Sequence, residues 1–138
     1  MFNRVRAVHI AVKSIAEATR DFAERFGFKV SQTAERPQDG VRNAILPFGN
    51  GDTIVEFLEP MVPGQGALAK FLEKRGEGVY MMAWEVDNID AAVKELTAKG
   101  VTLINADPAA RARGTNVFIH PKSAHGIMIE LIEKRTGS

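Results

Sequence analysis

AILPFGNGDTIVEFLE occupies residues 44–59, and FIHPKSAHGIMIELIE occupies residues 118–133. The two stretches align without a gap at a shift of 74 residues, and Glu56 then matches Glu130. Each stretch has an apolar run, a polar turn and a second apolar run, which is the pattern of a β-hairpin. Because a repeated hairpin indicates two similar halves, this pair of stretches decides the predicted fold.

The segments before each hairpin repeat in the same order. Residues 5–12 read as a β-branched strand, and residues 15–26 read as an amphipathic helix. Residues 79–86 and 88–100 read as a strand and a helix in the second half. A further strand follows each helix, so the sequence predicts an α+β fold with two βαβββ repeats.

The opening strands match less cleanly than the hairpins do. Aligning HIAVKSIAEA with MMAWEVDNIDAA needs a two-residue insertion after the strand, and this sets His9 against Met81. Two hairpins can resemble each other by chance, but the matched order of strand, helix and hairpin in both halves favours a repeat. The segment ARARGTN, residues 110–116, is expected to be a flexible loop.

We expect a single domain over residues 1–138. Repeat 1 covers about residues 5–60, and repeat 2 covers about residues 78–133. Between them, residues 61–77 hold a linker and a short helix, because the linker is rich in Pro and Gly and a helical pattern follows it.

Composition narrows the class of protein. The chain has 138 residues, 45% of them hydrophobic, and a net charge of +1 with both signs mixed along its length. The absence of cysteine excludes disulfides, thiolate metal sites and a cysteine nucleophile. No run approaches the ~20 apolar residues of a membrane span, and no basic stripe indicates nucleic-acid binding. We therefore expect a cytoplasmic protein that binds neither nucleic acid nor membrane.

Two glutamates and one histidine lie in apolar strands. Glu56 stands in TIVEFLE and Glu130 in GIMIELIE, so both carboxylates are expected to be at least partly buried. A buried carboxylate is protonated, paired or bound to a cation, because an unpaired buried charge is costly. Each Glu alone also fits an edge strand or an ion pair, and His9 alone also fits a satisfied core histidine. The equivalent repeat positions of the two glutamates favour a shared site, and with His9 they make a His–Glu–Glu set that suits Mn, Fe, Co, Ni or Zn.

The sequence resembles methylmalonyl-CoA epimerases over about residues 5–133. The motifs that carry the resemblance are VHIAV, VEFLEP, AWEVDNIDAA, FIHPKS and GIMIEL. These epimerases belong to the vicinal oxygen chelate superfamily, with glyoxalase I, bleomycin resistance proteins and extradiol dioxygenases. The resemblance implies a curved, mostly antiparallel sheet around a central cleft that holds a divalent metal ion. It implies His9, Glu56 and Glu130 as the metal ligands.

Two positions depart from the family pattern. The family has a further His ligand at the start of the second half, where this chain has Met81, and a neutral thioether is a poor ligand for hard divalent ions. The family loop carries a proton-transfer Glu, but this loop reads PQDGV and Gln38 cannot act as a base. Asp39, one residue further along, is the candidate replacement, and Glu130 is the second candidate catalytic residue.

Two functions remain open. In the first, the chain is a divergent metal-dependent isomerase or lyase that transfers a proton next to a carbonyl or thioester. In the second, it is a non-catalytic small-molecule binding protein, as bleomycin resistance proteins are. The expected substrate contacts are Met81, Trp84, His120 and Lys122. His120 and Lys122 would meet an anionic substrate such as an acyl-CoA, although a hairpin turn with a solvated lysine explains them equally well. The resemblance also implies a homodimer.

Overall fold

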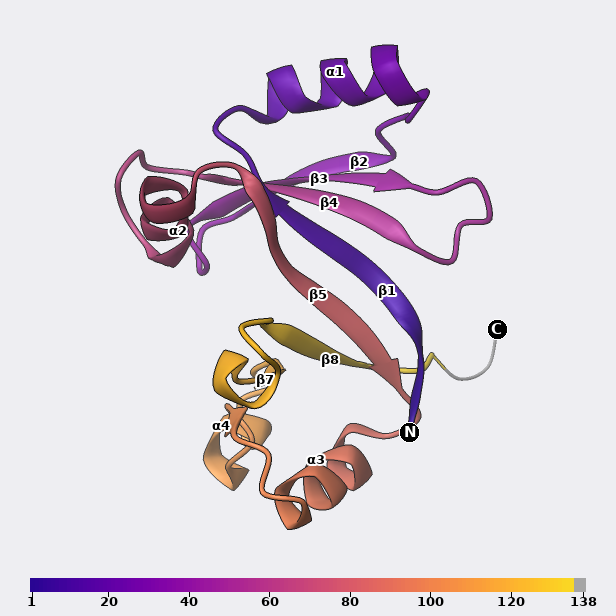
Figure 1. The fold of residues 1–138 in the computed structure, drawn as a ribbon, viewed down its shortest axis with the longest axis vertical. Coiled ribbons are helices and arrows are strands. Elements are labelled where there is room, and N and C mark those ends of the chain that lie inside the picture. Colours follow the sequence, from indigo (N-terminus) through magenta and orange to yellow (C-terminus); the bar gives the residue numbers. More distant parts are fainter. Residues whose placement is uncertain (136–138) are drawn as a thin grey trace. The chain divides into compact units, whose positions relative to one another are not determined.

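Each half of the chain has a strand, a helix and three further strands in that order, with two additional short helices between the later strands of the second half, and the predicted α+β class is confirmed (Figure 1). The structure is a computed structural model that describes residues 1–135. The elements of the first half are β1 (Phe2–Ala11), α1 (Ile15–Phe26), β2 (Gln32–Arg36), β3 (Val41–Pro47) and β4 (Ile54–Pro60), and α2 (Ala67–Arg75) follows them. The elements of the second half are β5 (Gly78–Val86), α3 (Ile89–Ala98), β6 (Leu103–Ile104), α4 (Pro108–Ala112), β7 (Val117–Ile119), the 3-10 helix η1 (Pro121–Ser123) and β8 (Ile129–Glu133).

Two structural units divide the chain slightly differently from the two halves. The N-terminal unit is Ala7–Tyr80, and the C-terminal unit combines Met1–Arg6 with the chain from Met81 onward. The strand order is β2-β3-β4-β1 in the N-terminal unit and β5-β8-β7-β6 in the C-terminal unit. β1 pairs with β4 and β5 pairs with β8 in parallel, whereas the β2–β3, β3–β4, β6–β7 and β7–β8 pairs are antiparallel.

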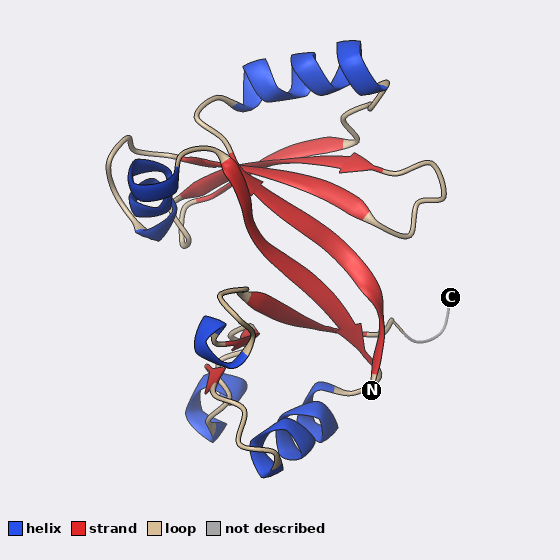
Figure 2. Cartoon of the chain, in the orientation of Figure 1, coloured by secondary structure: helices blue, strands red, loops and turns tan. Residues whose placement is uncertain are grey.

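Local capping signals define helix α1. The side chain of Ser14 accepts a hydrogen bond in the first turn, and Gly27 ends the helix with a left-handed φ of 76°. The apolar side of α1 packs on one face of the N-terminal sheet (Figure 2). The buried residues of that face are Val12, Ala44, Leu46, Val55 and Phe57. Because side chains alternate along a strand, His9 and Glu56 lie on the opposite face.

The glutamates that end the two matched stretches cap the helices of their own halves. Oε1 of Glu59 accepts a hydrogen bond from the backbone N–H of Ile15 at 3.1 Å, and Oε1 of Glu133 accepts one from Ile89 at 2.9 Å. Each carboxylate satisfies a first-turn N–H group and lies at the positive end of the helix dipole. The sequence repeat therefore includes a structural contact in addition to the candidate site residues.

Replacing Glu133 with alanine is expected to lower the free energy of unfolding by about 1 kcal/mol, because the N–H of Ile89 loses its acceptor. The matched control is Glu95→Ala on α3, where the carboxylate pairs with Lys99 at 3.3 Å. An exposed helical pair of this kind contributes about 0.2–0.5 kcal/mol. Urea unfolding measures both changes, and equal losses would contradict the capping role of Glu133.

The segment 110–116 is not wholly a loop, contrary to the sequence expectation. Helix α4 covers its first three residues and ends at Ala112. Oδ2 of Asp107 accepts a hydrogen bond from the N–H of Ala110 at 3.1 Å, and Pro108 takes the first helical position. Both residues are standard signals for the start of a helix.

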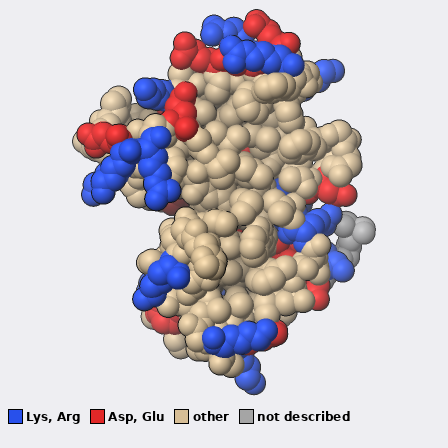
Figure 3. Space-filling view, in the orientation of Figure 1, with Lys and Arg blue, Asp and Glu red and all other residues tan. Residues whose placement is uncertain are grey.

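Charged side chains of both signs cover the outer helices of the N-terminal unit. Figure 3 shows Lys, Arg, Asp and Glu gathered together over α1 and over α2. On α1, Oδ1 of Asp21 lies 3.8 Å from Nη2 of Arg25, one turn along the helix. Exposed pairs of this kind contribute about 0–1 kcal/mol each, so the apolar side of the helix provides most of its attachment. Along the described residues, no helix has both the length and the apolar sequence needed to cross a membrane.

Candidate functional site

His9 and Glu56 face each other in the N-terminal unit. The parallel register of β1 and β4 sets the two residues opposite one another. Nδ1 of His9 lies 3.9 Å from Oε2 of Glu56, and the two residues are only 6% and 7% exposed. The structure therefore brings together two of the residues that the sequence singles out.

Asn43 joins this buried pair, and the sequence reasoning missed it. Asn43 lies on β3, is 1% exposed, and donates a hydrogen bond from Nδ2 to Oε2 of Glu56 at 3.3 Å. Within the part of the chain that the structure describes, Oδ1 of Asn43 and Nδ1 of His9 are buried without a hydrogen-bond partner. Leaving such an atom unpartnered costs about 1–3 kcal/mol. The only sequence signal is an asparagine, a residue that strands disfavour, inside the strand VRNAIL.

The electrostatic setting keeps the imidazole of His9 neutral. Burial lowers the pKa of His9 below its ordinary value, the carboxylate of Glu56 partly opposes this effect, and Arg36 adds to it. A neutral imidazole has a lone pair available near neutral pH. An imidazole nitrogen, a carboxylate and an amide oxygen are all donors that divalent cations accept. The donor chemistry and the two unpartnered buried atoms therefore fit a cation at this cluster.

Glu130 and Met81 belong to the C-terminal unit. Glu130 is half-buried on β8, and its register partners are Ala83 on β5 and Phe118 on β7. Met81 and Ala83 share one face of β5, because two residues separate them along the strand. Met81 and Glu130 therefore lie on the same face of this unit. Among residues 1–135, no three His, Cys, Asp or Glu side chains form a group that could hold a metal ion.

The strand register corrects the expected alignment of the opening strands. His9 lies opposite Glu56, whereas Ala83 lies opposite Glu130, so Ala83 is the counterpart of His9. The helix caps follow the same shift of 74 residues, because the contact of Ile15 with Glu59 recurs as that of Ile89 with Glu133. The expected two-residue insertion, which set His9 against Met81, is therefore wrong. Met81 corresponds instead to Ala7. This shared position is Ala7 in the first half and Met81 in the second, so neither half has a histidine there. His9 lies two residues after Ala7, on the same face of β1.

The remaining predicted site residues occupy varied settings. Trp84 packs into the core under α3, on the opposite face of β5 from Met81, and its ring meets that of Phe2 at 5.2 Å. Nδ1 of His120 accepts a hydrogen bond from the backbone N–H of Lys122 at 3.0 Å, which stabilises the turn. Asp39 and Lys122 are exposed. Roles for these residues in binding or proton transfer stay predictions.

Glu85 is a second buried carboxylate that the sequence reasoning missed, and it is 2% exposed. It accepts hydrogen bonds from Nη1 of Arg6 at 2.9 Å, from Nε of Arg4 at 3.2 Å and from Nδ2 of Asn3 at 3.2 Å. Burial alone would raise the pKa of Glu85, but the hydrogen bonds from Arg6, Arg4 and Asn3 outweigh it and hold the pKa below its ordinary value. These contacts attach the first residues of the chain to β5 within the C-terminal unit.

Glu85→Gln is expected to flatten the dependence of stability on acid pH. Because the folded-state pKa of Glu85 is lowered, its carboxylate stabilises the fold above the ordinary glutamate pKa. That contribution is lost as the pH falls through the folded-state value. Thermal melts from neutral to acid pH measure the effect, with the exposed Glu24→Gln as the matched control. Identical acid slopes for wild type and Glu85→Gln would contradict it.

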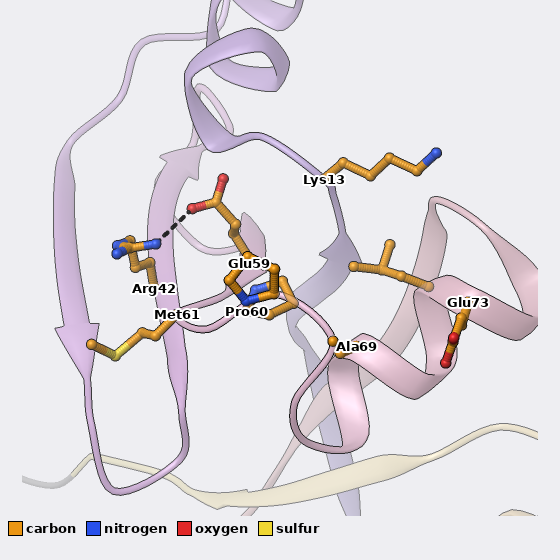
Figure 4. A pocket seen from close by; sticks show the side chains of 10 residues that line it. Lys13, Arg42, Glu59, Pro60, Met61, Ala69 and Glu73 are labelled. Carbon is orange, nitrogen blue, oxygen red and sulfur yellow. Dashed lines mark hydrogen bonds and ion pairs between the residues drawn. The ribbon is translucent and has the colours of Figure 1, made fainter.

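A cavity of about 640 Å³ lies within the N-terminal unit (Figure 4). Pro60, Met61 and Leu72 form part of its apolar lining, and Lys13 and Arg42 contribute cationic groups. Figure 4 shows Arg42 joined to Glu59, with 3.1 Å between Nη1 and Oε2, while Lys13 extends from another side of the cavity. The lining also holds the carboxylates of Glu59 and Glu73, so the volume and lining suit a small, partly apolar molecule without fixing its charge.

Comparisons with known proteins relate the chain to one superfamily and to several epimerases within it. Residues 7–119 match the family described as the Glyoxalase/Bleomycin resistance protein/Dioxygenase superfamily. The mitochondrial methylmalonyl-CoA epimerase of Dictyostelium discoideum is 33% identical over 133 residues, covering 95% of this chain and 78% of the relative. The ethylmalonyl-CoA/methylmalonyl-CoA epimerase of Cereibacter sphaeroides is 32% identical over 135 residues, covering 95% of this chain and 98% of the relative. A variant of Streptomyces coelicolor methylmalonyl-CoA epimerase, solved in complex with 2-nitronate-propionyl-CoA, has a TM-score of 0.83 at 29% identity, covering 99% of this chain and 97% of that chain.

Proposed function

The chain belongs to the glyoxalase/bleomycin resistance protein/dioxygenase superfamily, and from this premise we propose that it is an acyl-CoA epimerase. The observation that carries the proposal is the similarity to epimerases of methylmalonyl-CoA and ethylmalonyl-CoA over nearly the whole chain. The proposed substrate class is a thioester of coenzyme A with a carboxylate on the carbon next to the thioester carbonyl. The proposed homodimer and cytoplasmic location rest on the sequence alone.

The proposed reaction moves one proton at the carbon between the two carbonyl groups. A base removes the proton, and the electron pair of the broken C–H bond spreads onto the thioester oxygen. Return of a proton to the opposite face inverts the carbon, which requires an acid–base group on each side. Asp39, in the exposed turn before β3, and Glu130, on β8, are the proposed pair.

Three residues are the proposed ligands of a metal ion. A divalent cation bound by His9, Glu56 and, as the predicted further ligand, Glu130 would polarise the substrate oxygens and stabilise negative charge on them. The neutral imidazole of His9 supports this role because its lone pair is available. The hydrogen bond from Asn43 to Glu56 supports it because it restrains the carboxylate. Met81, Trp84, His120 and Lys122 remain the proposed substrate contacts.

In heavy water, the wild-type protein is expected to incorporate deuterium next to the thioester carbonyl of methylmalonyl-CoA and ethylmalonyl-CoA. Asp39→Asn is expected to slow this exchange by about 100-fold or more, because an amide cannot accept the proton. Asp52→Asn makes the same change in another exposed turn and is expected to keep the wild-type rate. Mass spectrometry of the recovered thioester measures the exchange, and background rates with both substrates would contradict the proposal.

A non-catalytic small-molecule binding protein is the second candidate. Met81 favours it, because a thioether replaces the histidine that the family resemblance implies at that position. The partly apolar cavity of the N-terminal unit also favours a small ligand. Calorimetric binding of a coenzyme A thioester that shows no deuterium exchange would support this function over the epimerase.

A further inference from the structure

We propose that Asn43 is a third protein donor of a divalent-cation site within the N-terminal unit, together with His9 and Glu56. The chemical purpose of the site rests on the proposed function, because a cation there would assist proton transfer next to a carbonyl. Its location rests only on the buried polar cluster of this unit.

Two polar side chains converge on one carboxylate oxygen of Glu56. Oε2 of Glu56 lies 3.9 Å from Nδ1 of His9 and 3.3 Å from Nδ2 of Asn43. The two atoms of the cluster that lack a partner, Nδ1 of His9 and Oδ1 of Asn43, therefore belong to side chains that approach the same oxygen. Buried polar atoms without partners are rare in native proteins, and an unplaced ion or water accounts for many of them.

Among the described residues, no cationic side chain is in contact with the carboxylate of Glu56. In this part of the chain, the side-chain contacts of Glu56 are those with the neutral groups of Asn43 and His9, and a buried carboxylate without an ion pair is costly. Arg36 is a nearby cation, since its charge acts on His9, but it is not among these contacts. Two apolar residues further along the same face, Ala11 and Leu58, are buried beside the cluster, at 0% and 5% exposed. A bound cation would supply both the charge and the partners that this cluster lacks.

The three side chains of the cluster offer donor atoms of mixed chemistry. One imidazole nitrogen, one carboxylate and one amide oxygen give a mixed nitrogen and oxygen set, which suits an ion such as Mn²⁺ or Co²⁺ better than a soft, thiolate-seeking one. All three donors come from adjacent strands of one unit, in the order β3, β4 and β1. The set needs no donor from Met81.

The Asn43→Asp variant distinguishes two roles for Asn43: a ligand of the ion, or a residue that only orients Glu56. If Oδ1 of Asn43 binds the ion, an aspartate supplies a charged oxygen at the same place, and binding becomes tighter. If Asn43 acts only through its hydrogen bond to Glu56, an aspartate removes that N–H donor, repels the carboxylate and weakens binding. The two roles therefore predict opposite changes in affinity.

The experiment titrates the full chain with Mn²⁺ by calorimetry and with Co²⁺ by visible absorption. We expect Asn43→Asp to bind Mn²⁺ about tenfold more tightly and to alter the Co²⁺ spectrum. We expect Asn43→Leu, which has a similar volume and no donor, to bind at least about tenfold more weakly. Asn50→Asp is the matched control, because it adds a carboxylate in an exposed turn and keeps the acceptor for the N–H of Asp52.

Each outcome decides the inference. Weaker or unchanged binding by Asn43→Asp overturns it, and if Asn43→Leu does not fold, Asn43→Ser replaces it with the same expected loss. If the wild-type protein binds neither ion but exchanges deuterium, the cation site is overturned and the proposed function stands. A buried water would then account for the two unpartnered atoms. If Asn43→Asp binds more tightly and Asn43→Leu more weakly than the wild type, but no deuterium is exchanged, the cation site is supported and the proposed epimerase activity is overturned.

Discussion

Glu56→Gln is expected to slow deuterium exchange into the thioester by about 100-fold or more without lowering the free energy of unfolding. The carboxylate is 7% exposed, and its side-chain partners among residues 1–135 are the neutral groups of Asn43 and His9. Glutamine has the same shape and keeps an oxygen that accepts from Asn43, but it removes a charge that is costly to bury. A substitution that keeps or raises stability but removes activity identifies a residue of the functional site.

A matched comparison distinguishes this result from a general effect of removing a glutamate. Glu133→Gln keeps an oxygen that accepts from the N–H of Ile89 but loses the negative charge at the start of helix α3, so it is expected to lose about 0.3–1 kcal/mol of stability and to keep the exchange rate. Chemical unfolding and mass spectrometry applied to both variants give the two readouts. Loss of stability with normal exchange in Glu56→Gln would assign Glu56 to the fold instead of the site.

Phe57→Ala is expected to lower the free energy of unfolding by about 3–5 kcal/mol. Phe57 is 1% exposed and lies in the cluster beneath α1, where its ring meets that of Phe22 edge to face at 4.8 Å. The loss combines the transfer of the ring to water with the cavity that remains, because a sheet and a capped helix cannot close around it. Guanidinium unfolding measures the change.

Phe26→Ala is the matched control. Phe26 also meets the ring of Phe22 edge to face, at 5.1 Å, but it is 64% exposed. An aromatic pair without burial contributes about 0.5–1.5 kcal/mol, so the expected loss is much smaller. Similar losses in the two variants would show that the cluster beneath α1 is not the main source of stability in this unit.

Local signals explain which parts of the fold the sequence predicted well. The ends of α1 match the prediction because Ser14 and Gly27 act on the turns beside them. Helix α4 was missed although Asp107 and Pro108 carry an ordinary start signal, because the arginine-rich segment after them was interpreted as a loop. The two antiparallel strand pairs were found because an apolar run lies on each side of a polar segment, although six residues separate β3 from β4 and nine, including η1, separate β7 from β8.

The candidate site was predicted only where the pattern along one strand was sufficient. His9 and Glu56 stand out as polar residues within apolar strands. Asn43 was missed because its contact with Glu56 crosses between strands, and Glu85 was missed because its partners lie about eighty residues away in the chain. The alignment of Met81 with His9 was wrong because it relied on similarity of side chains, whereas the register depends on backbone pairing.

The carboxylate caps on α1 and α3 also have a consequence for the order of folding. In each half, 44 residues separate the helix start from the glutamate that caps it. During synthesis, the residues at the helix start leave the ribosome before the glutamate does, so the helix can receive this cap only after the closing strand has been made. The helix of each half therefore gains its capping contact only after the last strand of that half is synthesised. The number of residues to be synthesised in between is the same in both halves. Slowing translation just before Glu59 would prolong the time for which α1 lacks this contact.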